Sequence, residues 1–285
     1  SIKRMKVTLN HIKDIWGSGT AIKQINISDI ESFKRAYKDK HSVFGINLNL
    51  RNIKTFLRWC VDRNMIKNMP KIKMIREPKK LPKYINECDM ESILNADNLS
   101  DYMKRVIYVY LTTGCRRSEI VQGILDGNIL IVPADLSKSR YERQISLNDT
   151  QSKIVKEIHK KRDTHLLNGF KLDNFSQLIT LAFGRACKRV GLKDYTLHCL
   201  RHTFAVTQWI ITNDIYEVKN LLGHTSVKTT ERYAQFNLDR LAQDFPNAYE
   251  VRLEIEKVRK NAINTPLINT PFIDSEDSSR IKPQA

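Results

Sequence analysis

The sequence lacks any long apolar run and any pairing pattern among its cysteines. No stretch approaches the roughly 18 apolar residues that span a bilayer, and the start, SIKRMKVTLN, has no apolar signal region. The five cysteines are scattered, odd in number and without a C-x-x-C pair. They argue against both a disulfide framework and a cysteine zinc site. These absences predict a cytoplasmic protein with no membrane contact.

Acidic residues are scarce relative to basic ones. The chain carries 48 Lys and Arg against 31 Asp and Glu, a formal net charge of +17. Residues 1–82 hold 19 of these basic residues and 6 of the acidic ones. Clustered positive charge is typical of nucleic-acid binding, because each neutralised phosphate releases condensed counterions. The alternative is an ordinary solvated surface from a Lys-rich composition.

The apolar content, 41% of 285 residues, is sufficient for real cores and favours two domains. The basic N-terminal part shows helical periodicity over residues 2–16 and 47–66, and Ser28 with Glu31 forms a candidate capping box for a helix between them. We expect one small helical bundle. The polar faces of this bundle would offer basic side chains to a duplex backbone, or would simply face water. These basic side chains are Lys34, Arg35, Lys38, Arg51, Lys54, Arg58 and Arg63.

Residues 70–82 combine three prolines with Lys and Arg, which predicts an extended basic linker. Beyond it, helical patterns cover 87–94, 102–112, 149–162 and 175–190, and short strands are expected at 129–133 and 142–147. Asp214 can cap a helix over 215–222 that ends at Gly223, and residues 239–260 predict one or two helices broken near Pro246. The expected organisation is therefore a helical domain (1–70), a linker (71–82), a second domain (83–260), mainly α with a small β-sheet, and a flexible tail (261–285).

The octapeptide LHCLRHTF, residues 197–204, raises a question about metal binding. His198 and His202 are four residues apart, so on a helix their imidazoles share a face, as zinc-binding histidines do. A zinc ion there would have to tolerate the neighbouring guanidinium of Arg201 with no carboxylate in the motif. A phosphate group suits both residue types, which favours an anion site.

Four stretches carry a family resemblance when they are taken in order. They are TGCRRSEI, SKSRYERQISL, LHCLRHTF and LLGHTSVKTTERYAQ. Together they resemble the tyrosine recombinases, the phage-integrase and Xer-type DNA strand exchangers, over nearly the whole chain. The resemblance implies a two-domain C-shaped DNA clamp, with a helical core-binding domain and a catalytic domain.

The resemblance also implies roles for particular residues. Two guanidiniums would stabilise charge on the phosphate, a lysine in the hairpin would protonate the leaving 5′-hydroxyl, and a tyrosine would be the nucleophile. His198 would accept a proton or bind the phosphate, His224 would donate a hydrogen bond to the phosphate, and a carboxylate would support the site. The residues are Arg116, Arg201, Lys138, Tyr233, His198, His224 and Glu119. Arg140 is the rival to Lys138, and His202 is interpreted as a supporting residue outside the catalytic set.

The implied activity is cleavage and rejoining of DNA strands through a 3′-phosphotyrosine, without metal, ATP or another cofactor. Four protomers would act on two duplexes, from a monomer free in solution, for integration, excision or dimer resolution. No extra N-terminal domain precedes the helical part, which favours a simple Xer-like or mobile-element recombinase, and the segment after Asn237 would dock on a neighbouring protomer. The alternatives are a DNA-binding regulator without turnover, a zinc hydrolase and a type IB topoisomerase.

Overall fold

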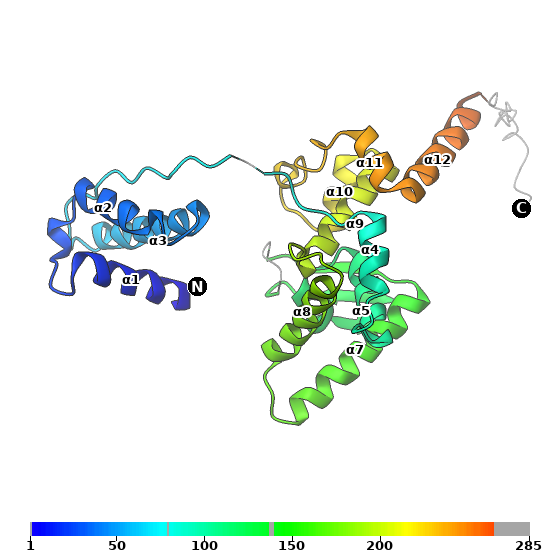
Figure 1. The fold of residues 1–285 in the computed structure, drawn as a ribbon, viewed down its shortest axis with the longest axis horizontal. Coiled ribbons are helices and arrows are strands. Elements are labelled where there is room, and N and C mark those ends of the chain that lie inside the picture. Colours follow the sequence, from blue (N-terminus) through cyan, green and yellow to red (C-terminus); the bar gives the residue numbers. More distant parts are fainter. Residues whose placement is uncertain (1, 79, 137–139, 265–285) are drawn as a thin grey trace, which may run out of the picture. The chain divides into compact units, whose positions relative to one another are not determined.

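The computed structural model describes residues 2–78, 80–136 and 140–264, with side chains described as far as residue 257. The chain divides into two compact units, Ser1–Lys80 and Leu81–Ala285. Within the described residues the regular structure is helical apart from one three-stranded sheet (Figure 1). This confirms the predicted class, mainly α with a small β-sheet. No described helix is long and apolar enough to cross a membrane.

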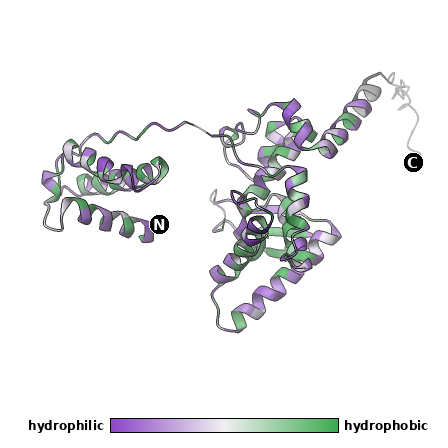
Figure 2. Ribbon diagram, viewed as in Figure 1, coloured by the Kyte–Doolittle hydropathy of each residue, from purple (hydrophilic) through white to green (hydrophobic). Residues whose placement is uncertain are grey.

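The first unit is a bundle of three helices, α1 (Ile2–Trp16), α2 (Ile27–Lys38) and α3 (Val43–Asp62). Its core is formed by side chains at helical spacing on α2 and α3, among them Ile30, Phe33, Leu50, Ile53 and Leu57. Figure 2 shows hydrophilic and hydrophobic residues alternating along these helices, as expected of elements with one face on a core.

The capping prediction for α2 was wrong by two residues. The N-cap is Asn26, whose side chain accepts a hydrogen bond from Ser28 N at 2.7 Å, and Asp29 Oδ2 accepts one from Asn26 N at 2.8 Å. Asn and Asp satisfy the first-turn amides as well as the predicted Ser and Glu would. The third helix also begins earlier than expected, after Ser42, whose hydroxyl accepts from Gly45 N.

The segment that follows α3 is irregular but fastened. Described residues 67–86 contain no helix or strand. The Asn47 side chain on α3 holds Ile75 by two bonds, Nδ2 to Ile75 O at 2.9 Å and Ile75 N to Oδ1 at 2.8 Å. Ile66 and Ile72 pack on the bundle core. The basic segment is therefore anchored on the first unit as far as Ile75.

The second unit contains nine α-helices among its described residues. The helices predicted over 87–94 and 215–222 have the predicted bounds, and those predicted over 102–112 and 149–162 are longer in the structure. The helix predicted over 175–190 spans Leu172–Arg189. The helices are α4 (Glu87–Leu94), α5 (Asp101–Thr113), α6 (Arg117–Gln122), α7 (Asp149–Leu167), α8 (Leu172–Arg189), α9 (Leu197–Thr212), α10 (Ile215–Leu222), α11 (Leu238–Asp244) and α12 (Pro246–Asn264). The helical break near Pro246 is confirmed, because proline takes the first position of α12.

The sheet is antiparallel, with strand order β1 (Ile124–Asp126), β2 (Ile129–Val132), β3 (Arg143–Ser146). The register pairs Ile129 with Ser146 and Val132 with Arg143. Arg143 therefore opens β3 directly after the connection that carries Lys138. Lys138 itself lies outside the described residues.

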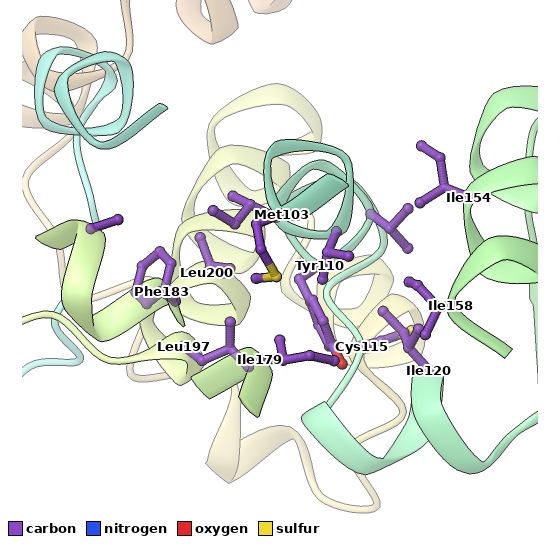
Figure 3. Packing of buried hydrophobic residues seen from close by; sticks show 14 of the residues in the cluster. Met103, Tyr110, Cys115, Ile120, Ile154, Ile158, Ile179, Phe183, Leu197 and Leu200 are labelled. Carbon is purple, nitrogen blue, oxygen red and sulfur yellow. The ribbon is translucent and has the colours of Figure 1, made fainter. Parts of the chain in front are cut away.

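Helix α9 lies between two apolar clusters of the second unit. Leu197 and Leu200 join the larger cluster, where they meet Met103 and Tyr110 of α5 and Phe183 of α8 (Figure 3). Farther along the same helix, Phe204, Ala205, Val206 and Ile210 join a second cluster that contains Val218, Leu222, Tyr233 and Leu241. Because α9 packs on both clusters, the positions of its polar residues are fixed.

Candidate active site

The turn between α5 and α6 places Arg116. Gly114 caps the C-terminal end of α5 at φ +61°, and a Cβ there would overlap Cδ1 of Phe204. Glycine is therefore required at this close approach. Arg116 then forms the N-cap of α6, and its backbone N–H donates to Glu119 Oε2 at 2.7 Å. Its guanidinium pairs with the other oxygen of the same carboxylate.

Glu119 is a buried carboxylate shared by three arginines. Its side chain is 1% exposed, and besides Arg116 it accepts from Arg143 Nη1 at 3.2 Å and lies 3.8 Å from Arg201 Nη1. Burial alone would raise the pKa of the carboxyl, but the Arg116 backbone bond and the three guanidinium charges outweigh it and lower the pKa. Glu119 is ionised and fixes three cations in one place.

Arg201 is the most buried of these arginines, at 3% exposure. It donates through Nη1 to Gly114 O and through Nη2 to Leu222 O, each at 2.6 Å. The two carbonyls belong to the ends of α5 and α10, so the guanidinium joins both helix ends to α9. Burial, with the charges of Arg116 and Arg143, lowers the pKa of Arg201 to about 10. It remains cationic at neutral pH.

His224 emerges directly after the C-terminal end of α10, as predicted. The Asp214 side chain caps this helix, and Gly223 ends it at φ +64°. A Cβ on Gly223 would lie 2.7 Å from Cδ of Arg143, so the arginine packs on the bare glycine. His224 Nδ1 is 2.9 Å from Thr230 Oγ1. Burial and the nearby arginine charges lower the pKa of His224 to about 4, which makes it neutral at pH 7.

Tyr233 lies in the turns that follow the short helix η2 (Val227–Thr229) and is 2% exposed. Its hydroxyl is 2.8 Å from Nδ1 of His202. Burial raises the pKa of the phenol, although the charges of Arg201 and Arg232 oppose the increase. The tyrosine is therefore protonated at neutral pH and lies within electrostatic range of Arg201.

His198 occupies the exposed start of α9, and its ring meets that of His202 edge-on, with centroids 4.6 Å apart. The structure thus brings together all the predicted site residues of the second unit that it describes. They are Arg116, Glu119, His198, Arg201, His224 and Tyr233.

The basic residues predicted to contact DNA all lie in the first unit. Most are exposed: Arg35, Lys38, Arg51, Lys54, Arg58 and Arg63. Lys34 differs, because its side chain is 14% exposed and its Nζ pairs with Glu31 Oε1 at 2.7 Å. Part of its charge is already neutralised within α2.

The sequence motifs did not identify two residues of the cluster, Arg143 and Thr230. Arg143 lies within the stretch SKSRYERQISL, in which Lys138 and Arg140 were the predicted candidates. Thr230 is fully buried, with its Oγ1 2.9 Å from His224 Nδ1. His202 was predicted to be a supporting residue. The available sequence signal for Arg143 was its position near the start of the strand predicted over 142–147. The sheet register and the hydrogen bond from Arg143 Nη1 to Glu119 Oε2 show that its side chain lies at this carboxylate.

The cluster suits an oxyanion better than a metal ion. Within the part of the chain that the structure describes, no group of three or more His, Cys, Asp and Glu could hold a metal ion. Guanidiniums, neutral imidazoles and a phenol are instead the groups that donate hydrogen bonds to a phosphate. The second unit therefore has a cationic site beside a tyrosine hydroxyl.

Comparison with known proteins agrees with this chemistry. Residues 83–240 match the Phage integrase family. The tyrosine recombinase XerA of Saccharolobus solfataricus is 28% identical over 202 residues, which cover 69% of this chain and 65% of that protein. The tyrosine recombinase XerD of Oceanobacillus iheyensis is 26% identical over 267 residues, covering 86% and 88%.

Solved structures show the same fold. Lambda integrase (75–356), bound as a dimer to a core site, has a TM-score of 0.62 at 18% identity, with 80% of this chain and 86% of that chain covered. The XerH recombinase on its difH substrate also has a TM-score of 0.62 at 18% identity, covering 85% and 78%. This chain belongs to the phage integrase family, the tyrosine-type site-specific DNA recombinases.

Proposed function

We propose that this protein cleaves and rejoins double-stranded DNA at a specific site through a 3′-phosphotyrosine on Tyr233. The observation that supports this most is the convergence of Arg116 and Arg201, distant in sequence, on the buried Glu119, with Tyr233 in electrostatic range. A fixed pair of guanidiniums beside a hydroxyl nucleophile is what phosphoryl transfer without metal or ATP requires.

The reaction divides among these residues. As Tyr233 attacks, Arg116 and Arg201 stabilise the negative charge on the non-bridging phosphate oxygens. The neutral imidazole of His224 donates a hydrogen bond to the phosphate, and His198 contacts it from the exposed start of α9. Lys138, from the family resemblance, protonates the leaving 5′-oxygen. The phosphotyrosine keeps the bond energy, so the returning hydroxyl rejoins the strand without another cofactor.

The exposed basic residues of the first unit, with the basic segment after α3, would contact the duplex backbone. We propose that the two units form a C-shaped clamp on DNA. When one unit binds, it raises the local concentration of the other at the same DNA, so the linked surfaces bind more tightly than either alone. Among related structures, lambda integrase occurs as a tetramer on a Holliday junction. We extend this to four protomers on two duplexes, assembled in the cytoplasm from a monomer free in solution.

The biological outcome is integration, excision or dimer resolution, in a Xer-like or mobile-element setting. The segment after Asn237, which includes α11 and α12, would dock on a neighbouring protomer and couple cleavage to assembly.

Covalent trapping tests the proposal. The protein is incubated, in chelator, with a DNA site carrying a nick near the scissile phosphate, so that a short strand diffuses away and ligation fails. We expect a denaturation-resistant protein–DNA adduct that is absent in Tyr233→Phe. The Tyr249→Phe variant, which removes another tyrosine of the same unit, is the matched control. An adduct that persists in Tyr233→Phe, or cleavage that requires a metal, would contradict the proposal.

A further inference from the structure

The hydrogen bond of the Tyr233 hydroxyl goes to a histidine outside the predicted catalytic set. His202 Nδ1 lies 2.8 Å from Tyr233 Oη, within the range of a good hydrogen bond. The histidine is on α9, which is held between two apolar clusters, whereas Tyr233 lies in a turn segment. The helix fixes the imidazole, and the Tyr233 side chain packs in the second of these clusters.

The surroundings of His202 keep it neutral. Burial, followed by the charges of His198, Arg232, Arg201 and His224, lowers its pKa to about 3. A neutral imidazole has one nitrogen with a free lone pair and one with a proton. With its proton on Nε2, His202 presents the Nδ1 lone pair to the phenolic O–H.

A bound phosphate would change this balance. The groups that depress the pKa of His202 are cationic or become cationic, and Arg201 is also one of the proposed phosphate ligands. A phosphodiester docked among them brings a negative charge that offsets their repulsion of a proton on His202. The basicity of the imidazole therefore rises when substrate is present.

We infer that His202 is a further catalytic residue, which accepts the phenolic proton of Tyr233 at Nδ1 during strand cleavage. The inference rests on the proposed function. As the bond from Tyr233 Oη to phosphorus forms, the phosphorus–O5′ bond breaks, the O–H proton moves to Nδ1, and O5′ receives a proton from the general acid. In rejoining, the 5′-hydroxyl attacks and gives its proton back to the general acid, the Oη–phosphorus bond breaks, and His202 returns its proton to Oη. His198, which was predicted to accept the proton or to bind the phosphate, is left to contact the phosphate.

Substitution by asparagine separates proton transfer from positioning. The Asn side chain can place its amide oxygen near the position of Nδ1, so His202→Asn keeps an acceptor for the hydroxyl but cannot take its proton. General base catalysis contributes about 10²–10⁴-fold. At neutral pH we expect His202→Asn to form the covalent adduct at least about 100-fold more slowly than the unsubstituted protein. The difference in rate between His202→Asn and the unsubstituted protein should shrink as pH rises toward the pKa of the phenol, because hydroxide then removes the phenolic proton.

Single-turnover adduct formation on the nicked DNA, from pH 6 to pH 10, is the measurement. His159→Asn is the matched control, because His159 is another half-buried histidine of the unit, bonded through Nε2 to Ile120 O at 2.8 Å. It should keep the pH profile of the unsubstituted protein. Imidazole added to His202→Ala should restore part of the rate, and gel-shift assays and circular dichroism would verify DNA binding and folding.

The results have distinct meanings. An unchanged rate in His202→Asn, or a faster rate in His202→Ala, overturns the inference; the latter would make His202 a restraint on the resting tyrosine. The same pH-dependent loss in His198→Asn, with none in His202→Asn, also overturns it. If the unsubstituted protein forms no adduct, the proposed function fails first, and this step fails with it.

Discussion

Replacing Glu119 by glutamine, which is nearly isosteric, would remove the carboxylate charge that three guanidiniums face. Arg143 Nη1 is 3.2 Å and Arg201 Nη1 is 3.8 Å from Oε2. At an effective dielectric constant of about 20, each pair is worth roughly 4–5 kcal/mol before the cost of burying the charges. Removing one partner from a buried ionic cluster typically lowers the free energy of unfolding by about 3–5 kcal/mol. We expect Glu119→Gln to lose that much stability at pH 7.

Equilibrium unfolding in urea, followed by circular dichroism, measures the loss. Asp101→Asn is the control, because Asp101 is also in the first turn of a helix and pairs with Lys104 at 3.7 Å, but its side chain is 88% exposed. An exposed pair is worth at most about 1 kcal/mol. Equal effects of the two substitutions would refute the argument that Glu119 organises the cluster.

The pH dependence gives a second test of the same carboxylate. The pKa of Glu119 is lowered in the folded protein. Its ionisation therefore contributes stability that is fully present above the unfolded value of about 4.3, and this is lost as pH falls through the folded pKa. The stability difference between the unsubstituted protein and Glu119→Gln should narrow below pH 4. A difference that stays constant down to pH 2 would contradict the assignment.

Three further outcomes are expected. Gly223→Ala should cost about 2 kcal/mol in urea unfolding, because φ is +64° and the new Cβ would displace Arg143, and strand cleavage should slow with it. DNA affinity, measured by fluorescence anisotropy, should fall with salt, and Arg58→Ala should reduce the log–log slope by about 0.9 if it contacts one phosphate. Lys34→Ala should leave that slope nearly unchanged, because Lys34 is paired with Glu31. An equal slope change in both variants would contradict this distinction.

Local sequence signals predicted much of the fold. The helix over 215–222, with its Asp214 cap and its end at Gly223, was predicted residue by residue, since the capping and the termination signals are both local. The short elements α6 and β1 were missed. At this length neither has enough residues to show a period, and both are stabilised by packing on neighbouring elements.

The same division applies to the site. The family motifs located Arg116, Arg201, His224 and Tyr233, but motif order cannot tell which atoms face one another. The bond between His202 and Tyr233 joins α9 to a distant turn, and the ion pair of Arg143 with Glu119 depends on strand register. These contacts arise from tertiary packing, so only the structure makes them visible.

The measurement that tests the central claim most directly is the chemical identity of the DNA linkage. After trapping and trypsin digestion, cleavage at Arg232 and Arg240 releases residues 233–240, YAQFNLDR, in which Tyr233 is the one tyrosine. Mass spectrometry should find this peptide joined through its tyrosine oxygen to a 3′-phosphate of the cleaved strand. Nucleotide on another peptide, or a link to a 5′-phosphate, would contradict the account.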